Sequence, residues 1–123
     1  MLRIVPALLC FVFICWNILE ANSAGNNIFF ELVRSLPYGD KLGHLVLYGT
    51  LSLLTIIAFN HRCVQVKGYP LPLGALVVLA LALAEELSQL FLSNRTFDMA
   101  DISADIAGIV IFTLLLNKCR AKQ

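Results

Sequence analysis

Residues 71–92 read LPLGALVVLALALAEELSQLFL, an almost unbroken apolar run that carries ionisable groups only near its end. Those groups are Glu85 and Glu86, followed one helical turn later by Gln89. About 20 apolar residues span the hydrocarbon core of a bilayer as an α-helix, so the run predicts a membrane-spanning helix. A charge near the centre of a span costs on the order of 3 kcal/mol, so carboxylates retained in a span indicate special packing or function.

Three further apolar runs, at 2–19, 42–59 and 100–116, have a similar length. The chain is 59% hydrophobic and only 14% charged, whereas about 25% of residues are charged in soluble domains. We therefore expect an all-α membrane protein with one domain, residues 1–123, and four transmembrane helices in a compact bundle. The first run follows Arg3 as in a signal peptide, but it exceeds the usual ~7–15 apolar residues. We interpret it as an uncleaved helix.

The distribution of basic residues predicts the orientation. With four spans, both termini and the loop between the second and third spans lie on the same side of the membrane. The charged residues expected there are all basic: Arg3, Arg62, Lys67, Lys118, Arg120 and Lys122. By the positive-inside rule this side is cytoplasmic. We therefore expect cytoplasmic N- and C-termini and a polar cluster that faces outward.

The first outward-facing loop contains a short periodic segment. Ile28, Leu32 and Leu36 repeat every four residues, with charged residues between them. This pattern favours a short helix lying in the membrane interface, and a loop packed over the bundle is the alternative. We expect Pro37 to end this segment.

Acidic residues and prolines predict where the spanning helices begin. We expect Asp40 to cap the second span, because its carboxylate can accept from the free N–H groups of the first turn. Pro70 and Pro72 are expected to open the third span, because proline suits the first turn of a helix. Asp98 and Asp101 can cap the fourth span, where Ala100, Ala104 and Gly108 form a small-residue ladder that lets helices approach closely.

Polar residues of the last three spans fall at the same membrane face. His44 and Tyr48 are one turn apart on the second span, and Glu86 and Gln89 share a face of the third. Arg95 lies in the connection that follows, where a guanidinium can pair with carboxylates of both flanking helices. The expected site consists of Lys41, His44, Tyr48, Glu86, Gln89, Arg95, Asp98, Asp101 and Asp105.

Our leading hypothesis is a pocket that binds an amphiphilic envelope molecule: a lipid headgroup, a lipid-linked cell-wall intermediate or a glycopeptide. Lys41 and Arg95 would attract an anionic headgroup, and His44, Tyr48 and Gln89 would supply hydrogen bonds. The bilayer itself is a necessary partner.

Two alternatives stay open. The first is an intramembrane hydrolase or transferase with His44 as general base and Glu86 as its partner, although only Ser88 and Ser103 offer a nucleophile. The second is a structural role, in which the charges hold the outer ends of the helices together and the protein partners another membrane protein.

Several other functions are excluded or not expected. A net charge of +1 excludes a strongly electrostatic nucleic-acid binder. The sequence contains no glycine-rich phosphate loop, so we expect no nucleotide cofactor. We expect no metal site, because His44 is the only outward histidine and no thiol is near it. The Glu85-Glu86 pair lacks the arginine and paired histidines of Glu-Glu-x-x-x-Arg intramembrane proteases, since position 90 is Leu.

The order and spacing of the site residues resemble the VanZ-like family of small bacterial membrane proteins. The resemblance covers roughly residues 37 to 112 and rests on Asp40-Lys41-x-x-His44-x-x-x-Tyr48, Glu86-x-x-Gln89, Arg95-x-Phe97-Asp98 and Asp101-Ile102-x-Ala104-Asp105-x-x-Gly108. It implies four spans in the bacterial cytoplasmic membrane, with the signature residues clustered at one face. The founding member is associated with resistance to the glycopeptide teicoplanin. This chain departs from the family pattern at Asp105, where the family usually has Asn.

Overall fold

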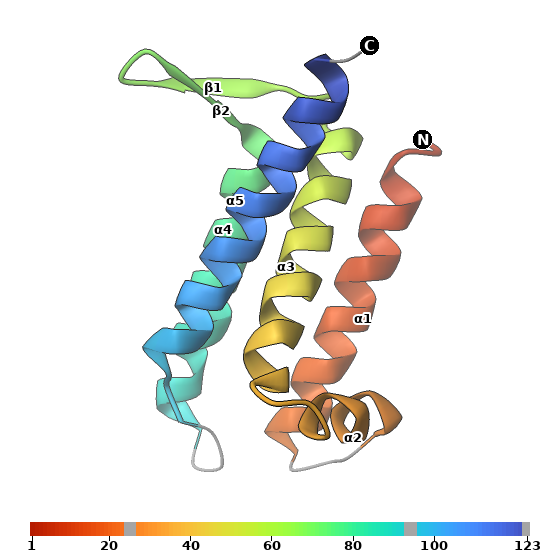
Figure 1. Cartoon of the computed structure of the whole chain (residues 1–123), viewed down its shortest axis with the longest axis vertical. Helices are drawn as coiled ribbons and strands as arrows, with labels where there is room; N and C mark the ends of the chain where they lie inside the picture. Colours follow the sequence, from red (N-terminus) through yellow and green to blue (C-terminus); the bar gives the residue numbers. More distant parts are fainter. Residues whose placement is uncertain (24–26, 93–95, 122–123) are drawn as a thin grey trace.

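A computed structural model describes residues 1–23, 27–92 and 96–121 of the chain. In these ranges the elements are α1 (Ile4–Asn22), α2 (Ile28–Arg34), α3 (Gly39–Ala58), β1 (Cys63–Val66), β2 (Tyr69–Pro72), α4 (Leu73–Ser88), the 3-10 turn η1 (Gln89–Phe91) and α5 (Met99–Ala121) (Figure 1). Four segments are long and apolar enough to cross a membrane: Ile4–Asn22, Gly39–Ala58, Leu73–Phe91 and Met99–Asn117. The predicted four-span bundle is confirmed, and no predicted span boundary differs from the observed one by more than three residues.

The two ends of the bundle carry different features (Figure 1). Both termini and the β1–β2 hairpin lie at one end, where Arg3 Nη1 donates to Asn60 Oδ1 at 3.0 Å and joins the start of α1 to the chain just after α3. Helix α2 and the first turns of α3 and α5 lie at the other end. The described polar residues of the predicted site therefore belong to the end opposite the termini.

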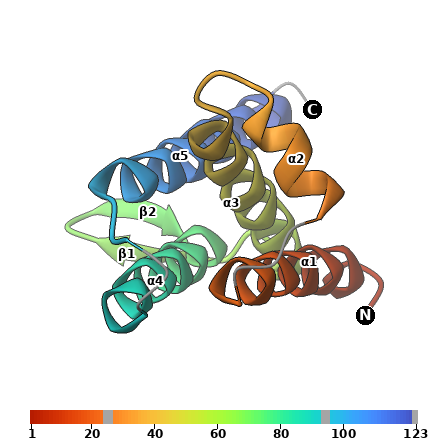
Figure 2. The same cartoon turned by 90° about the horizontal axis from the view of Figure 1, so that it is seen from below.

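Helix α3 is the centre of the bundle and packs against α1, α4 and α5, as seen along the helices in Figure 2. The buried core consists of Ile14, Tyr48, Leu51, Val78, Ala82 and Ile109. By contrast, Leu9 and Val12 of α1 are 66% and 62% exposed. An apolar outer surface of this kind is what a lipid-facing helix requires, because its solvent is hydrocarbon.

Helices α3 and α5 touch through glycines, as the small-residue ladder predicts. A Cβ at Gly108 would collide with the backbone carbonyl of Leu45, and a Cβ at Gly49 would lie 2.9 Å from the Gly108 carbonyl oxygen. Gly74 plays the same part between α4 and α3, because a Cβ there would lie 2.5 Å from the Ile56 nitrogen. The approach at Gly108 adjoins the polar end, because Leu45 follows His44 in α3.

The prediction that Pro70 and Pro72 open the third span is wrong for Pro70, whereas Pro72 is the N-cap residue of α4 without lying in its first turn. Both prolines lie in β2, which pairs antiparallel with β1, and α4 begins at Leu73. Lys67 and Gly68 form the turn with φ of 50° and 83°, as a tight hairpin requires. Leu73 N–H donates to the Arg62 carbonyl at 2.8 Å, so this pair is hydrogen-bonded. Hydrogen-bonded and non-hydrogen-bonded pairs alternate along the ladder, so Pro72 and Pro70 face Cys63 and Gln65 at non-hydrogen-bonded positions. A proline is tolerated there because no ladder donor is lost.

The helix starts near the polar end were predicted with mixed success. The short helix of the first loop is present as α2, and the Asn27 side chain caps it by accepting from Phe30 N–H at 2.9 Å. Asp98 caps α5, since its Oδ1 accepts from Ala100 N–H at 2.8 Å. The prediction that Asp40 caps α3 is wrong: Tyr38, with a left-handed φ of 54°, precedes the helix, and Asp40 lies inside the first turn.

Candidate functional site

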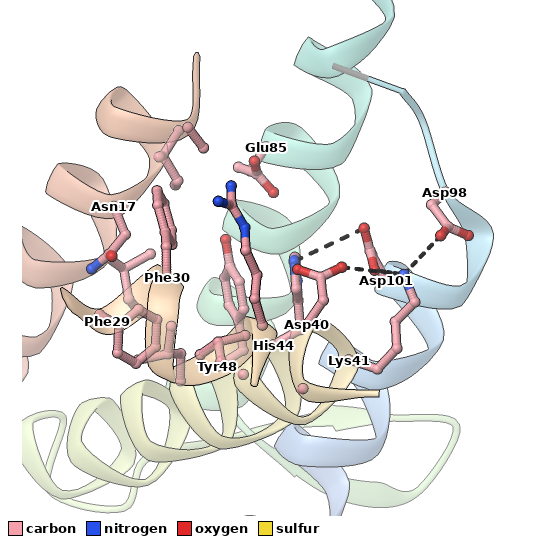
Figure 3. A pocket seen from close by; sticks show the side chains of 18 of the residues that line it. Asn17, Phe29, Phe30, Asp40, Lys41, His44, Tyr48, Glu85, Asp98 and Asp101 are labelled. Atoms are coloured by element: carbon pink, nitrogen blue, oxygen red, sulfur yellow. Dashed lines mark hydrogen bonds and ion pairs between the residues drawn. The ribbon is translucent and has the colours of Figure 1, made fainter. Parts of the chain in front are cut away.

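A cavity of about 710 Å³ lies at the end of the bundle that holds α2 (Figure 3). One part of its lining is apolar and comes mainly from α1 and α2, with Ile14, Ile18, Phe29, Phe30 and Val33. The other part is polar, and its members include Asn17, Asp40, Lys41, His44, Tyr48, Glu85, Gln89, Asp98 and Asp101. The cavity is therefore amphipathic, with its polar part supplied mostly by α3, α4 and the start of α5.

Among the described residues, the cations that line the cavity are Arg34 of α2 and Lys41 of α3. Lys41 Nζ lies 2.7 Å from Asp98 Oδ2 and 3.3 Å from Asp40 Oδ2, and it also pairs with Asp101. The hydrogen bond from Lys41, together with that from Ala100 N–H, holds the pKa of the Asp98 carboxyl below its usual range. The pairs join the first turn of α3 to the first turn of α5.

The place of Arg95 in the site stays a prediction, because Arg95 lies outside the described residues. Among the described residues, Lys41 pairs with several carboxylates as Arg95 was predicted to do, but its partners lie in α3 and at the start of α5. Asp101, which was expected to serve as a helix cap, directs its carboxylate to Lys41.

His44 lies between two carboxylates of α5 that are one turn apart. Its Nδ1 is 2.8 Å from Asp105 Oδ1, and its Nε2 is 3.9 Å from Asp101 Oδ2. The Tyr48 ring stacks on the imidazole with a centroid separation of 6.1 Å and an interplanar angle of 20°. His44 is consequently fixed by contacts on both edges and on its face.

The two adjacent glutamates of α4 have different surroundings. Glu86 is fully buried, whereas Glu85 is half-buried and lines the cavity. Gln89, which is 2% exposed, donates from Nε2 to Glu85 Oε1 at 2.9 Å and to Glu86 Oε1 at 3.3 Å. Successive helical residues point about 100° apart, so only one of the pair can face the bundle centre.

Glu86 and Asp105 form a buried layer that does not line the cavity. Both are 0% exposed. Glu86 Oε2 and Asp105 Oδ2 have no hydrogen-bond partner within the described part of the chain. His44 connects this layer to the cavity, because it lines the cavity and also contacts Asp105.

Among the described residues, two groups of side chains at this end can each offer three metal ligands. They are Asp40, His44 and Asp101, and His44, Glu86 and Asp105, and within each group the ligand atoms all lie within 4.8 Å of one another. Sequence reasoning expected no metal here, because the helical spacing of one histidine and several carboxylates does not require a site. Tertiary packing brings the ligands together from different helices.

Sequence reasoning missed several cavity residues, above all Asn17 and the aromatic pair Phe29 and Phe30. Asn17 is 6% exposed, donates to the Phe13 carbonyl at 2.9 Å and accepts from Asn27 Nδ2 at 3.5 Å. The available signal was an amide within the apolar run 2–19. For the aromatic pair, no local signal distinguishes a cavity-lining ring from a membrane-facing one.

The serines considered as nucleophiles lie away from the cavity. Ser88 Oγ donates to the Glu85 carbonyl at 2.6 Å, and Ser103 Oγ donates to the Met99 carbonyl at 2.9 Å. Both residues are exposed, and neither lines the cavity. Each hydroxyl is engaged by its own helix, as is common for serine in apolar helices.

Comparison with known proteins identifies a family. A search of curated proteins and a search of solved structures each found no match. The sequence model of the VanZ/LLP1 family matches residues 4–120, which include all four apolar helices and every residue of the candidate site. On this match over nearly its whole length, the chain belongs to the VanZ/LLP1 family.

Proposed function

We propose that the cavity binds an amphiphilic molecule of the cell envelope, with the apolar part against α1 and α2 and the headgroup against α3 and α5. The observation that carries this proposal is the division of one lining into an apolar and a polar part. Binding sites for lipid-like molecules need both, since the chain is held by apolar burial and the headgroup by a few placed polar groups. A bilayer lipid, a lipid-linked cell-wall intermediate and a glycopeptide all have this character.

The surroundings of Lys41 indicate the chemistry of the headgroup. Sequence reasoning expected Lys41 to attract an anion, but its ammonium already pairs with three carboxylates. An incoming anion would have to displace these partners. Carboxylate oxygens are acceptors only, so we propose a headgroup rich in donors, such as amino or hydroxyl groups. This proposal replaces the anionic headgroup of the earlier hypothesis.

The same proposal includes the bacterial cytoplasmic membrane, cytoplasmic termini and an outward-facing cavity. Support comes from the positive-inside rule and from the position of the cavity at the end opposite the termini. Reporter fusions at the C-terminus test the orientation: a fused phosphatase that needs export should be inactive, and a fused fluorescent protein that needs the cytoplasm should fluoresce. The reverse pattern would place the cavity inside the cell.

The geometry favours binding over the hydrolase or transferase alternative. His44 contacts Asp105 at 2.8 Å, so the general-base pair would be His44 and Asp105 rather than His44 and Glu86. Neither Ser88 nor Ser103 reaches this pair through the cavity. The partnering role is compatible with binding, because the ion pairs of Lys41 can hold α3 and α5 together while the cavity is occupied.

The test is lipid retention by the purified full chain, measured by native mass spectrometry after extraction with its own lipids. Phe30→Ala removes a ring that lines the cavity, and Leu32→Ala, on the same helix but 62% exposed, is the matched control. Burying a phenylalanine side chain contributes about 1.5–3 kcal/mol, so Phe30→Ala should weaken retention by roughly ten-fold or more. Leu32→Ala should leave it unchanged.

Variants of the polar part test the headgroup. Asp101→Asn should weaken retention of amine-bearing lipids more than that of lipids without a donor. Arg95→Gln tests the original expectation of an anionic headgroup and should act mainly on anionic lipids if that expectation holds. Equal retention by Phe30→Ala and Leu32→Ala, or a lipid content independent of all four substitutions, would refute the binding proposal.

A further inference from the structure

The buried layer beneath the cavity brings together one imidazole and two carboxylates from three different helices. His44 comes from α3, Glu86 from α4 and Asp105 from α5. The two carboxylate residues are 0% exposed, and the His44 side chain is only 16% exposed. Their ligand atoms lie within 4.8 Å of one another. The three side chains come together only through the packing of three helices, so helix capping does not explain why they lie here.

The carboxylates of this layer are incompletely paired. Glu86 Oε1 accepts from Gln89, and Asp105 Oδ1 contacts His44, but Glu86 Oε2 and Asp105 Oδ2 have no partner among the described residues. A buried carboxylate oxygen without a partner is strongly unfavourable. Two such oxygens beside one imidazole form a buried set of acceptors that suits a cation.

The outer ligand group differs because its cation is already present. Asp40 and Asp101 both pair with Lys41 Nζ. A metal ion bound to Asp40, His44 and Asp101 would have to compete with that ammonium. No lysine or arginine side chain of the described residues pairs with Glu86 or Asp105. Of the two groups, the inner one is thus the better metal site.

We propose that His44, Glu86 and Asp105 bind one divalent first-row transition-metal ion, such as Zn²⁺. A neutral imidazole and two ionised carboxylates give a charge of minus two, which a divalent ion balances. These donors are ordinary zinc ligands. A tetrahedral ion holds its ligand atoms roughly 3.4 Å apart, so side-chain shifts of about 1 Å from the present spacing are sufficient. Three protein ligands leave the ion an open position, and His44 connects it to the cavity.

The metal proposal shares only His44 with the cavity lining and can be tested separately from amphiphile binding. Glu86 and Asp105 do not line the cavity, so metal retention and lipid retention can each fail while the other persists. The site also depends on Asp105, because an asparagine there would offer one neutral oxygen and would leave the divalent charge half balanced.

The test uses the full chain in detergent, stripped with a chelator, equilibrated with Zn²⁺ and freed of unbound ion by gel filtration. Elemental analysis should give one zinc ion per chain. Glu86→Gln and Asp105→Asn keep the side-chain shape but remove a charge, and each should weaken zinc binding by roughly 100-fold or more, beyond the effect of losing an outer-shell partner. Glu20→Gln, on α1 and outside both the group and the cavity lining, is the matched control and should bind as the parent does.

A second probe and a second variant keep the test decisive. Co²⁺ should give visible absorption bands in the parent that are absent in Asp105→Asn. If Glu86→Gln does not fold, as judged by circular dichroism and gel filtration, Glu86→Asp retains the carboxylate and should bind zinc measurably. Zinc binding undiminished in Asp105→Asn would show that Asp105 is not a ligand, and cobalt spectra with thiolate charge-transfer bands would assign the ion to cysteines. Either result would overturn the proposal. Failure of the folded parent to retain zinc would overturn it as well.

Discussion

Replacement of Gly108 by alanine should separate α3 from α5. The new methyl group would collide with the Leu45 carbonyl oxygen and would lie 2.8 Å from its carbon and 3.0 Å from its Cα. These are backbone atoms, which cannot move without moving the helix. Overpacking of this kind costs about 1–3 kcal/mol, and the better helix propensity of alanine offsets about 0.5–1 kcal/mol. The expected net loss is about 1–2 kcal/mol.

Gly43 provides the matched control for this substitution. It lies in α3, where a Cβ would meet only the two Val33 methyl groups at 3.8 Å, an ordinary contact. Gly43→Ala should therefore gain about 0.5–1 kcal/mol from helix propensity alone. The same chemical change should destabilise at one position and stabilise at the other, with a difference of about 2 kcal/mol.

The assay is reversible unfolding in mixed micelles, with a denaturing detergent titrated into a mild one and helicity followed by circular dichroism. Because Leu45 adjoins His44 and Asp105 is one turn from Gly108, Gly108→Ala should also lengthen the contact between His44 and Asp105. A stability of Gly108→Ala equal to that of the parent, or a shift of both variants in the same direction, would refute the close-packing argument.

Two further predictions concern the ion pairs of Lys41. Lys41→Met leaves Asp101, which is 9% exposed, without its cation and should lower the free energy of unfolding by about 1–3 kcal/mol, between the ranges for exposed and buried pairs. Adding Asp101→Asn to Lys41→Met should recover part of that loss. If the losses of stability in the two single variants simply add in the double variant, the pairing of Lys41 with Asp101 is contradicted. The lowered pKa of Asp98 means that its carboxylate stabilises the fold above its ordinary pKa, and that this stabilisation is lost as the pH falls through the lower folded-state pKa. Unfolding curves of the parent and Asp98→Asn should therefore differ at neutral pH and converge at acidic pH, once the pH is below the lowered pKa of Asp98. A constant difference across this titration would show that the Asp98 charge does not contribute.

The spanning helices were predictable because the signal is local. Twenty consecutive apolar residues determine a span whatever they pack against, since the bilayer leaves no other way to satisfy the backbone. The close helix packing at Gly108 was also predictable, because small residues at four-residue spacing indicate a close approach whichever helix is the partner. The hairpin at 63–72 was not readable from Pro70 and Pro72 alone. Proline is acceptable both in a helix's first turn and in an edge strand, and strand pairing decided between them.

For the candidate site, the sequence by itself determined that His44, Glu86 and Asp105 would lie at the same end of the bundle. Helical rise and alternating direction fix depth from residue number alone. Which side chains meet was decided only by the tertiary structure. Contact between residues 61 positions apart, such as His44 and Asp105, depends on the rotation and crossing of α3 and α5 at Gly108, and neither helix encodes that alone. The physical reason is that membrane depth is a one-dimensional property of the chain, whereas pairing is a property of packed surfaces.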